Sequence, residues 1–178
     1  MIALRLATAA DIPALEALIP LSARELQRDY YTPQQIEDAL GTIFGVDSQL
    51  IADGTYFVVE SGDTIVGCGG WSRRTTLFGG DSGKAACPDT QLDPVTDAAR
   101  IRAFFVHPSW ARQGLGARII DACEGAARAA GFRKLELVAT LAGEPLYKRF
   151  AYIAGQRYAL TLHTGIELPV VRMTKSLA

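Results

Sequence analysis

The chain contains 178 residues, of which 49% are hydrophobic, and its formal net charge is -1. This length and apolar content suit one packed core, so we expect residues 1–178 to form a single domain. The near-zero charge excludes the global positive field that gathers nucleic acid or anionic membrane, so we expect neither partner and look for any anion site locally.

The N-terminus and the cysteines bear on location and redox chemistry. Residues 1–6 lack the basic start and long apolar run of a signal peptide, and no stretch elsewhere reaches membrane-spanning length. Cys68, Cys87 and Cys123 are widely spaced and form no Cys-x-x-Cys pair. We therefore expect a cytoplasmic protein with reduced thiols and no metal.

The first part of the chain predicts a strand followed by helices. Apolar residues alternate over residues 2–6, as in a strand with one buried face, and a capping box at residues 8–11 opens an amphipathic helix. A second box at residues 22–25 predicts a separate short helix towards Tyr30, and residues 32–35 open another. Three helices should therefore precede the next strand.

A β-hairpin is predicted next. Residues 56–60 and 64–72 are β-branched and aromatic runs joined by Ser-Gly-Asp, which is a common hairpin turn sequence. Gly67, Gly69 and Gly70 weaken the second run as a strand. They indicate either a bulge or the close approach of another element.

Residues 73–98 form an unusually long connection that has no sustained hydrophobic period. The segment carries Arg73, Arg74 and Lys84 together with several aspartates, so its charge does not identify a ligand. Connections of this length are often functional, and a flexible solvated flap is the alternative.

A strand, a glycine-bearing loop and a long amphipathic helix follow. The strand is expected over residues 100–106, and Gly114 and Gly116 stand where the helix begins. Glycine has no Cβ, so the backbone can approach a ligand closely, and the first turn of a helix leaves N–H donors unpaired. The helix dipole adds partial positive charge, and Arg112 can add a full one. The stretch predicts a phosphate site, and a simple chain turn is the alternative.

The remaining elements complete one sheet. Gly131 should end the long helix, and residues 134–139 should form a strand parallel to the one at 100–106, because a whole helix separates the two. Residues 156–163 and 167–174 predict a closing antiparallel hairpin. We expect a single mixed, mostly antiparallel sheet of about seven strands with a central parallel pair and helices on both faces.

Two segments resemble the GNAT superfamily of N-acetyltransferases. Residues 106–108 and 111–116 resemble the family's strand end and pyrophosphate loop, with Ala111 at a position that is usually Gln or Arg. Residues 140–152 resemble the segment Asn/Ser-x-x-Ala-x-x-x-Tyr-x-x-x-Gly-Phe, of which Tyr147 is retained unchanged. The two segments stand in the family's order, one helix and one strand apart. The resemblance implies an α/β fold of the α+β GNAT type.

The resemblance also implies acetyl-CoA as co-substrate. Backbone groups at the strand end would hold the pantetheine and polarise the thioester carbonyl, and the loop with the helix start would hold the pyrophosphate. Tyr147 is implied as the general acid that protonates the leaving sulfur, and a packing role is the alternative. The implied cofactor-binding residues are Phe104, Phe105, Val106, Arg112, Gln113, Gly114, Leu115, Gly116, Ala117 and Thr140.

The acceptor side is predicted by position alone. In the family the N-terminal helices flank the acceptor, so Tyr30 and Tyr31 either line that site or anchor to the surface. Trp71 either faces the site or packs in the core. Arg100 and Arg102 alternate onto one strand face, where they either bind an acceptor carboxylate or pair with nearby aspartates.

No general base is assigned. Some family members place a glutamate on the strand that feeds the loop, but this strand carries arginines, and a guanidinium group does not give up its proton. Glu136, Glu60, His107 and a water chain remain open.

These assignments predict an acetyl-CoA-dependent N-acetyltransferase that acts by direct transfer on a primary amine of a small molecule or peptide. A non-catalytic acyl-CoA-binding regulatory module would keep the loop without needing Tyr147. A phosphate or nucleotide sensor is disfavoured, because no base-reading or ribose-reading feature accompanies the loop. Neither segment identifies the acceptor, and a homodimer is an open alternative to a monomer.

Overall fold

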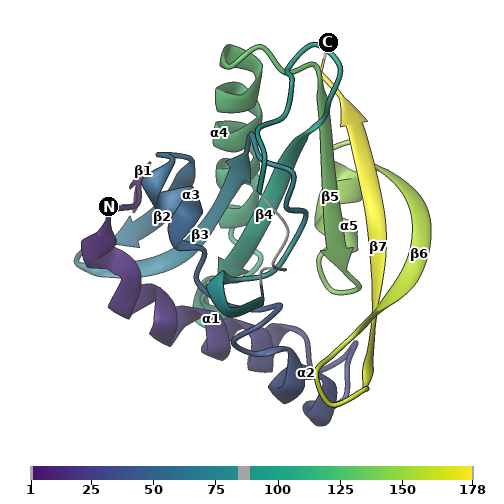
Figure 1. Ribbon diagram of the computed structural model, residues 1–178. Helices are drawn as coiled ribbons and strands as arrows, with labels where there is room; N and C mark the ends of the chain where they lie inside the picture. The colour runs from purple at the N-terminus through teal and green to yellow at the C-terminus, as the bar shows by residue number, and fades with distance from the viewer. Residues whose placement is uncertain (1, 84–88, 178) are drawn as a thin grey trace.

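The computed structural model describes residues 2–83 and 89–177, and within these ranges seven strands form one sheet (Figure 1). The strands are β1 (Ile2–Leu6), β2 (Tyr56–Ser61), β3 (Thr64–Ser72), β4 (Ala99–Val106), β5 (Lys134–Thr140), β6 (Ile153–Thr161) and β7 (Glu167–Ser176). The α-helices are α1 (Ile12–Leu26), α2 (Pro33–Ala39), α3 (Ser48–Ala52), α4 (Leu115–Ala129) and α5 (Glu144–Arg149). Short 3-10 turns are η1 (Ala9–Asp11), η2 (Asp81–Gly83) and η3 (Pro108–Trp110).

The sheet has the order β1-β2-β3-β4-β5-β7-β6. Within the described part of the chain, β4 and β5 are the parallel pair and the other neighbours are antiparallel, which confirms the predicted mixed sheet. β4 and β5 pair at Ala99↔Leu135 and Arg100↔Glu136. Beyond these positions the two strands separate, although each continues for several residues.

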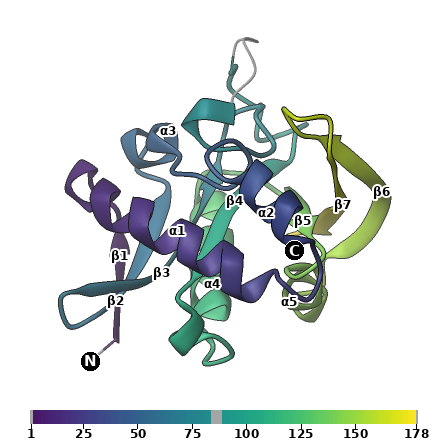
Figure 2. The same ribbon diagram turned by 90° about the horizontal axis from the view of Figure 1, so that it is seen from below.

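Helices cover both faces of the sheet, as predicted. Figure 2 shows α4 and α5 on one side of the sheet and α3 on the other, and α1 packs against β3 and β4 in the core opposite α4. On the α4 face, Ile119 and Cys123 pack with Leu135 in one apolar core. On the opposite face, Leu15 and Phe105 belong to a second core. The central strands are therefore buried from both sides.

Both predicted roles of the glycines in β3 are present. The pairing with β4 shifts register between Cys68 and Gly70, which marks a bulge. A Cβ on Gly69 would lie 2.7 Å from the Phe104 ring, and one on Gly70 would lie 2.7 Å from the Tyr56 ring. Any side chain at these positions would displace an aromatic ring, so glycine allows the close packing.

The prediction that a separate helix begins at residues 22–25 is wrong. Helix α1 runs without a break through this stretch, with Pro20 inside it. The Ser22 hydroxyl does not cap a helix; it accepts a hydrogen bond of 3.1 Å from the Val106 N–H of β4. The sequence also did not predict the short helix α3, whose first turn is capped by the Asp47 carboxylate through the Leu50 N–H.

The described part of the long 73–98 connection is anchored to the protein. Arg74 forms an ion pair of 2.6 Å with Asp53, and the Leu92 N–H donates to the Arg73 carbonyl at 2.7 Å. The Gly80 N–H donates to the Thr42 carbonyl at 2.8 Å. These described stretches are therefore docked and do not form a solvated flap. Lys84 and Cys87 lie outside the described residues.

The described cysteines are free thiols that are buried in the core. Cys68 and Cys123 are free and buried, and burial raises the pKa of the Cys68 thiol to about 12. Among residues 2–83 and 89–177 no group of His, Cys, Asp and Glu is placed to hold a metal ion. None of the described helices has the length and apolar character needed to cross a membrane.

Candidate active site

A cleft of about 880 Å³ opens where β4 and β5 separate. One side of it is formed by the start of α4 and by α5, and the other by the end of α1 with the loops at residues 43–44 and 77–79. The cleft therefore reaches both faces of the sheet. Every residue predicted to bind the cofactor lines it except Gln113, whose exposed side chain donates to the Ser109 carbonyl at 3.0 Å.

The loop before α4 has the backbone shape that the sequence suggested. Arg112 and Gly114 have φ angles of +63° and +84°, and α4 begins at Leu115. The first N–H groups of α4 have no partner within the helix and point towards the loop. At Gly116 a Cβ would lie 2.9 Å from Cδ2 of Leu146, so glycine lets the start of α4 lie close to α5.

The ends of β4 and β5 expose backbone to the cleft. Ala103 has a φ of +57°, which bends β4, and its carbonyl accepts a hydrogen bond of 2.9 Å from the Tyr56 hydroxyl. The Val106 N–H is bonded to Ser22, so a ligand carbonyl at this group would have to replace the Ser22 hydroxyl. On β5, the Thr140 hydroxyl accepts from the Gly143 N–H at 3.1 Å and fixes the turn into α5.

Helix α5 places Tyr147 in the wall of the cleft. The side chain is 8% exposed, and its ring packs edge-on against Phe104 and Tyr152 at centroid distances of 6.0 and 5.7 Å. Burial raises the pKa of the Tyr147 hydroxyl above its ordinary value, so the group stays protonated. The Tyr147 hydroxyl makes no hydrogen bond to another residue in the described ranges. A protonated hydroxyl in this position can donate a proton to a ligand.

Three of the residues considered for the acceptor side lie outside the cleft. Tyr31 is buried, and its hydroxyl donates to the Pro169 carbonyl at 2.6 Å and accepts from the Leu141 N–H at 2.9 Å. Trp71 packs in the core against Phe132, with ring centroids 6.1 Å apart. The third, Arg100, is paired with a buried glutamate of β5. Trp71 therefore packs in the core, as its alternative had it, and Arg100 is ion-paired, although with a glutamate and not an aspartate. Tyr31 is buried and is not anchored at the surface.

The other two residues considered for the acceptor side, Tyr30 and Arg102, line the cleft. Tyr30 is 48% exposed. Arg102 is 4% exposed and forms an ion pair of 2.7 Å with Asp47, which is fully buried, and it donates to the Gly79 carbonyl at 2.6 Å. Burial lowers the pKa of Arg102, but a guanidinium group keeps its charge. The positive charge is therefore already neutralised by the protein.

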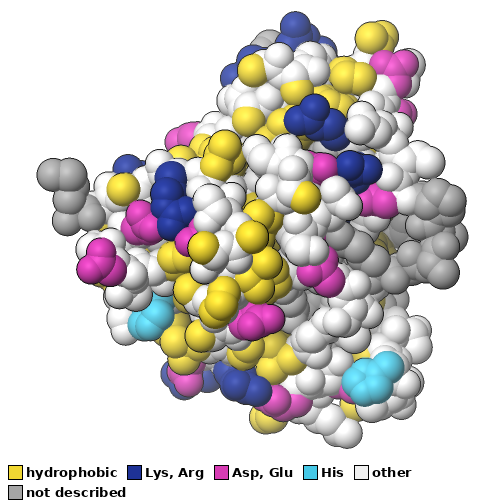
Figure 3. All heavy atoms as spheres, turned by 60° about the vertical axis from the view of Figure 1, so that its left-hand side comes forward, with side chains coloured by type: hydrophobic (Ala, Val, Ile, Leu, Met, Phe, Trp, Pro, Cys, Tyr) yellow, Lys and Arg dark blue, Asp and Glu magenta, His cyan; other side chains and the backbone are white. Residues whose placement is uncertain are grey.

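None of the candidate general bases lines the cleft. Glu136 is buried between Arg100 and Arg172, and Glu60 is paired with Arg5 at the far edge of the sheet. His107 lines a separate hollow of about 320 Å³ beside α1. Figure 3 shows hydrophobic side chains gathered on that side of the molecule, with acidic and basic side chains interspersed among them. Water remains the open alternative.

The sequence did not reveal several cleft residues, because their neighbours in the cleft are far from them in the chain. Gln27, Phe44, Phe78 and Leu160 belong to four separate segments and meet only in the folded chain. A weak signal was available in Gly80, two residues after Phe78. Its absent Cβ lets the loop lie against residue 45, where a Cβ would meet backbone atoms at 2.9 Å.

Comparisons with known proteins agree with this geometry. Residues 20–152 match the family model described as the acetyltransferase (GNAT) family. A comparison with curated proteins finds no match.

Among solved structures, a GCN5-related N-acetyltransferase of Rhodopseudomonas palustris is similar to this chain, with 24% identity, a TM-score of 0.72, and coverage of 98% of this chain and 95% of that one. The PaiA N-acetyltransferase of Thermoplasma acidophilum, in complex with coenzyme A, has 10% identity, a TM-score of 0.63 and 99% coverage of both chains. The yncA protein of Salmonella typhimurium, with its cofactor acetyl-CoA, has 14% identity, a TM-score of 0.61, and coverage of 99% and 94%. These likenesses show a shared fold.

Proposed function

This chain belongs to the acetyltransferase (GNAT) family, and on that premise we propose that it moves the acetyl group of acetyl-CoA directly to a primary amine of a small molecule or peptide. The observation that carries the proposal is the single cleft that joins the start of α4 and Tyr147 to the α1 side of the sheet. Direct transfer needs the thioester and the amine to meet, and a cleft open to both faces allows this. We also propose that residues 1–178 act as one domain.

The residues present suit acetyl-CoA, which supplies an activated acetyl group when bound. The first N–H groups of α4 and the Arg112 guanidinium provide donors and positive charge for a pyrophosphate. Beyond Arg100 and Glu136, β4 and β5 no longer pair with each other, so the backbone at their separated ends can meet the pantetheine amides. Two of the similar structures hold coenzyme A or acetyl-CoA, which supports this choice of co-substrate.

Tyr147 is proposed as the general acid. It donates its hydroxyl proton to the sulfur as the carbon–sulfur bond breaks and the new carbon–nitrogen bond forms. Solvent takes the proton that the attacking amine loses and returns one to Tyr147. The raised pKa of Tyr147 suits this role, because the hydroxyl holds its proton until the thiolate develops.

Mass spectrometry of the purified protein with acetyl-CoA and a mixed panel of amines tests cofactor and acceptor together. We expect an acetylated amine and free CoA in equal amounts. Binding of CoA without acetylation of any amine would instead support a non-catalytic acyl-CoA-binding module. No CoA binding by calorimetry would refute both.

The pyrophosphate assignment has its own test at the start of α4. In Gly116→Val, the new side chain meets Leu146, and both residues line the cleft, so CoA affinity should fall at least tenfold. Gly125→Val is the matched control, because Gly125 lies on the same helix and a Cβ there meets nothing within 4 Å. Equal CoA affinity in the two folded variants would contradict the assignment.

A further inference from the structure

The half of the cleft on the α1 side has an apolar wall. We call it the acceptor half and define it by the cleft residues from the end of α1, from residues 43–44 and 77–79, and from β4, β6 and β7 on that face. Its apolar side chains include Leu26, Ile43, Phe44, Leu77, Phe78 and Leu160. Burying an aliphatic or aromatic group against such a wall is favourable, at about 25 cal/mol per Å².

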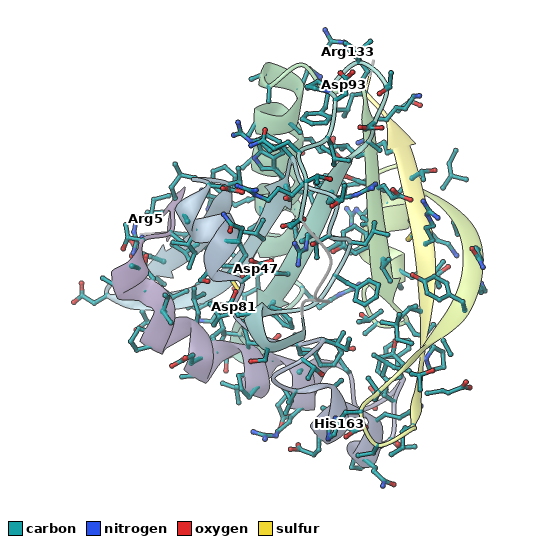
Figure 4. All side chains as sticks on the ribbon, in the orientation of Figure 1. Arg5, Asp47, Asp81, Asp93, Arg133 and His163 are labelled. Carbon is teal, nitrogen blue, oxygen red and sulfur yellow. The ribbon has the colours of Figure 1, made fainter. Side chains whose placement is uncertain are left out.

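Within the described residues, Arg102 is the charged side chain of the acceptor half, and its charge is already used. Asp47 pairs with it at 2.7 Å, and the Gly79 carbonyl accepts from it at 2.6 Å. Figure 4 shows Asp47 in front of the central strands and close to Asp81. A ligand carboxylate would therefore find no free cation here, and a second ammonium group would find no carboxylate among the residues that line the cleft.

Gln27 supplies a polar group with no partner. It caps the end of α1, its side chain lines the cleft, and the residue is 8% exposed. Its Oε1 atom is buried and has no hydrogen-bond partner in the described chain. A buried amide oxygen without a partner is costly, so such atoms are nearly always satisfied in the functional state. An amine N–H is a suitable donor to it.

We propose that the acceptor is a primary amine on an uncharged apolar body, aromatic or branched aliphatic, whose nitrogen donates a hydrogen bond to Gln27. This inference rests on the proposed acetyl transfer. An apolar wall disfavours the charged form of a bound amine, which suits a site that offers no side-chain base. A peptide fits less well, because each backbone N–H and C=O group that it buried would need a polar partner.

Four amines separate the alternatives. We expect kcat/KM for 2-phenylethylamine to exceed, by at least tenfold, the values for phenylalanine, spermidine and a tripeptide with N-terminal alanine. Phenylalanine is the matched comparison, because it adds only a carboxylate to the same body. An equal or higher value for any of the other three would overturn the inference.

Calorimetric binding of the same four amines to the CoA-bound protein keeps this test separate from the proposed function. If no amine is acetylated, the transferase proposal fails, but the preference for 2-phenylethylamine should persist in binding. Loss of that preference in binding would overturn the inference by itself.

The hydrogen bond is tested by Gln27→Met, which keeps the side-chain length and removes the amide. KM for 2-phenylethylamine should rise about tenfold, while kcat and CoA affinity stay unchanged. Gln34→Met on α2 is the matched control, because Gln34 is exposed and lies outside the cleft. An unchanged KM in Gln27→Met, or a loss of CoA affinity, would contradict the contact.

Discussion

Replacing Tyr147 by Phe tests the proposed general acid directly. The ring packs against Phe104 and Tyr152, and its hydroxyl makes no hydrogen bond within the described chain, so the fold should tolerate the change. We expect the free energy of unfolding to change by less than about 0.5 kcal/mol. Positioned general acids contribute roughly 10² to 10⁴ in rate, and a thiolate is a fairly good leaving group. The turnover number should therefore fall about 100-fold, or about 2.7 kcal/mol.

The assay is steady-state turnover at saturating acetyl-CoA and amine, with single-turnover mixing to show that chemistry limits the rate. Because burial raises the pKa of Tyr147, the wild-type protein should also keep its turnover up to about pH 10, where an ordinary tyrosine is half ionised. Tyr152→Phe is the matched control, because its buried hydroxyl has no hydrogen-bond partner within the described chain and the residue does not line the cleft. Wild-type turnover in Tyr147→Phe, or an equal loss in both variants, would refute the assignment.

Three further substitutions test the fold around the site. Asp47→Ala should lower the free energy of unfolding by about 3 to 5 kcal/mol in chemical denaturation, because it leaves the Arg102 charge buried and unpaired. Gly114→Ala should cost about 1 to 2 kcal/mol in the same measurement, since its φ is +84° although a Cβ meets nothing within 4 Å; no change would mean that the loop relaxes. Arg5 holds the pKa of Asp11 well below its ordinary range, so the pair stabilises the fold above about pH 4 and the gain is lost as pH falls through the folded-state pKa. Asp11→Asn should therefore lose less stability than wild type between about pH 6 and about pH 3, and parallel curves would contradict this.

The sequence by itself determined the strands, the long helix α4 and their order, because these signals are local. Alternating residues in strands, the helical period behind Gly114 and the cap at Gly131 depend on neighbours only a few positions away. A helix between two strands also required the parallel pair at the centre of the sheet, so the loop before α4 could be placed at a strand end. The side of the cleft that we propose for the cofactor could therefore be located from this order.

The tertiary structure decided which polar groups find each other. Ser22 had the sequence signature of a helix cap, but its hydroxyl bonds to Val106, 84 positions away, so α1 continues through it. From the sequence, the two arginines of β4 could either face an acceptor or form ion pairs within the protein. Both form ion pairs, with Glu136 and Asp47, which are far from them in the sequence. The sequence shows which hydrogen bonds a side chain is able to form, and the fold decides which partner it meets.

The acceptor half of the cleft also belongs to the tertiary structure. It is built from the end of α1, two irregular loops and the last hairpin, which are far apart in the sequence and meet in the folded chain. Gln27 and Phe78 therefore carry no local signal of their place, because the other segments of the acceptor half are far from them in the sequence. The proposed cofactor loop is a contiguous stretch of the chain, but the proposed acceptor site arises only through the packing of segments that are far apart in sequence.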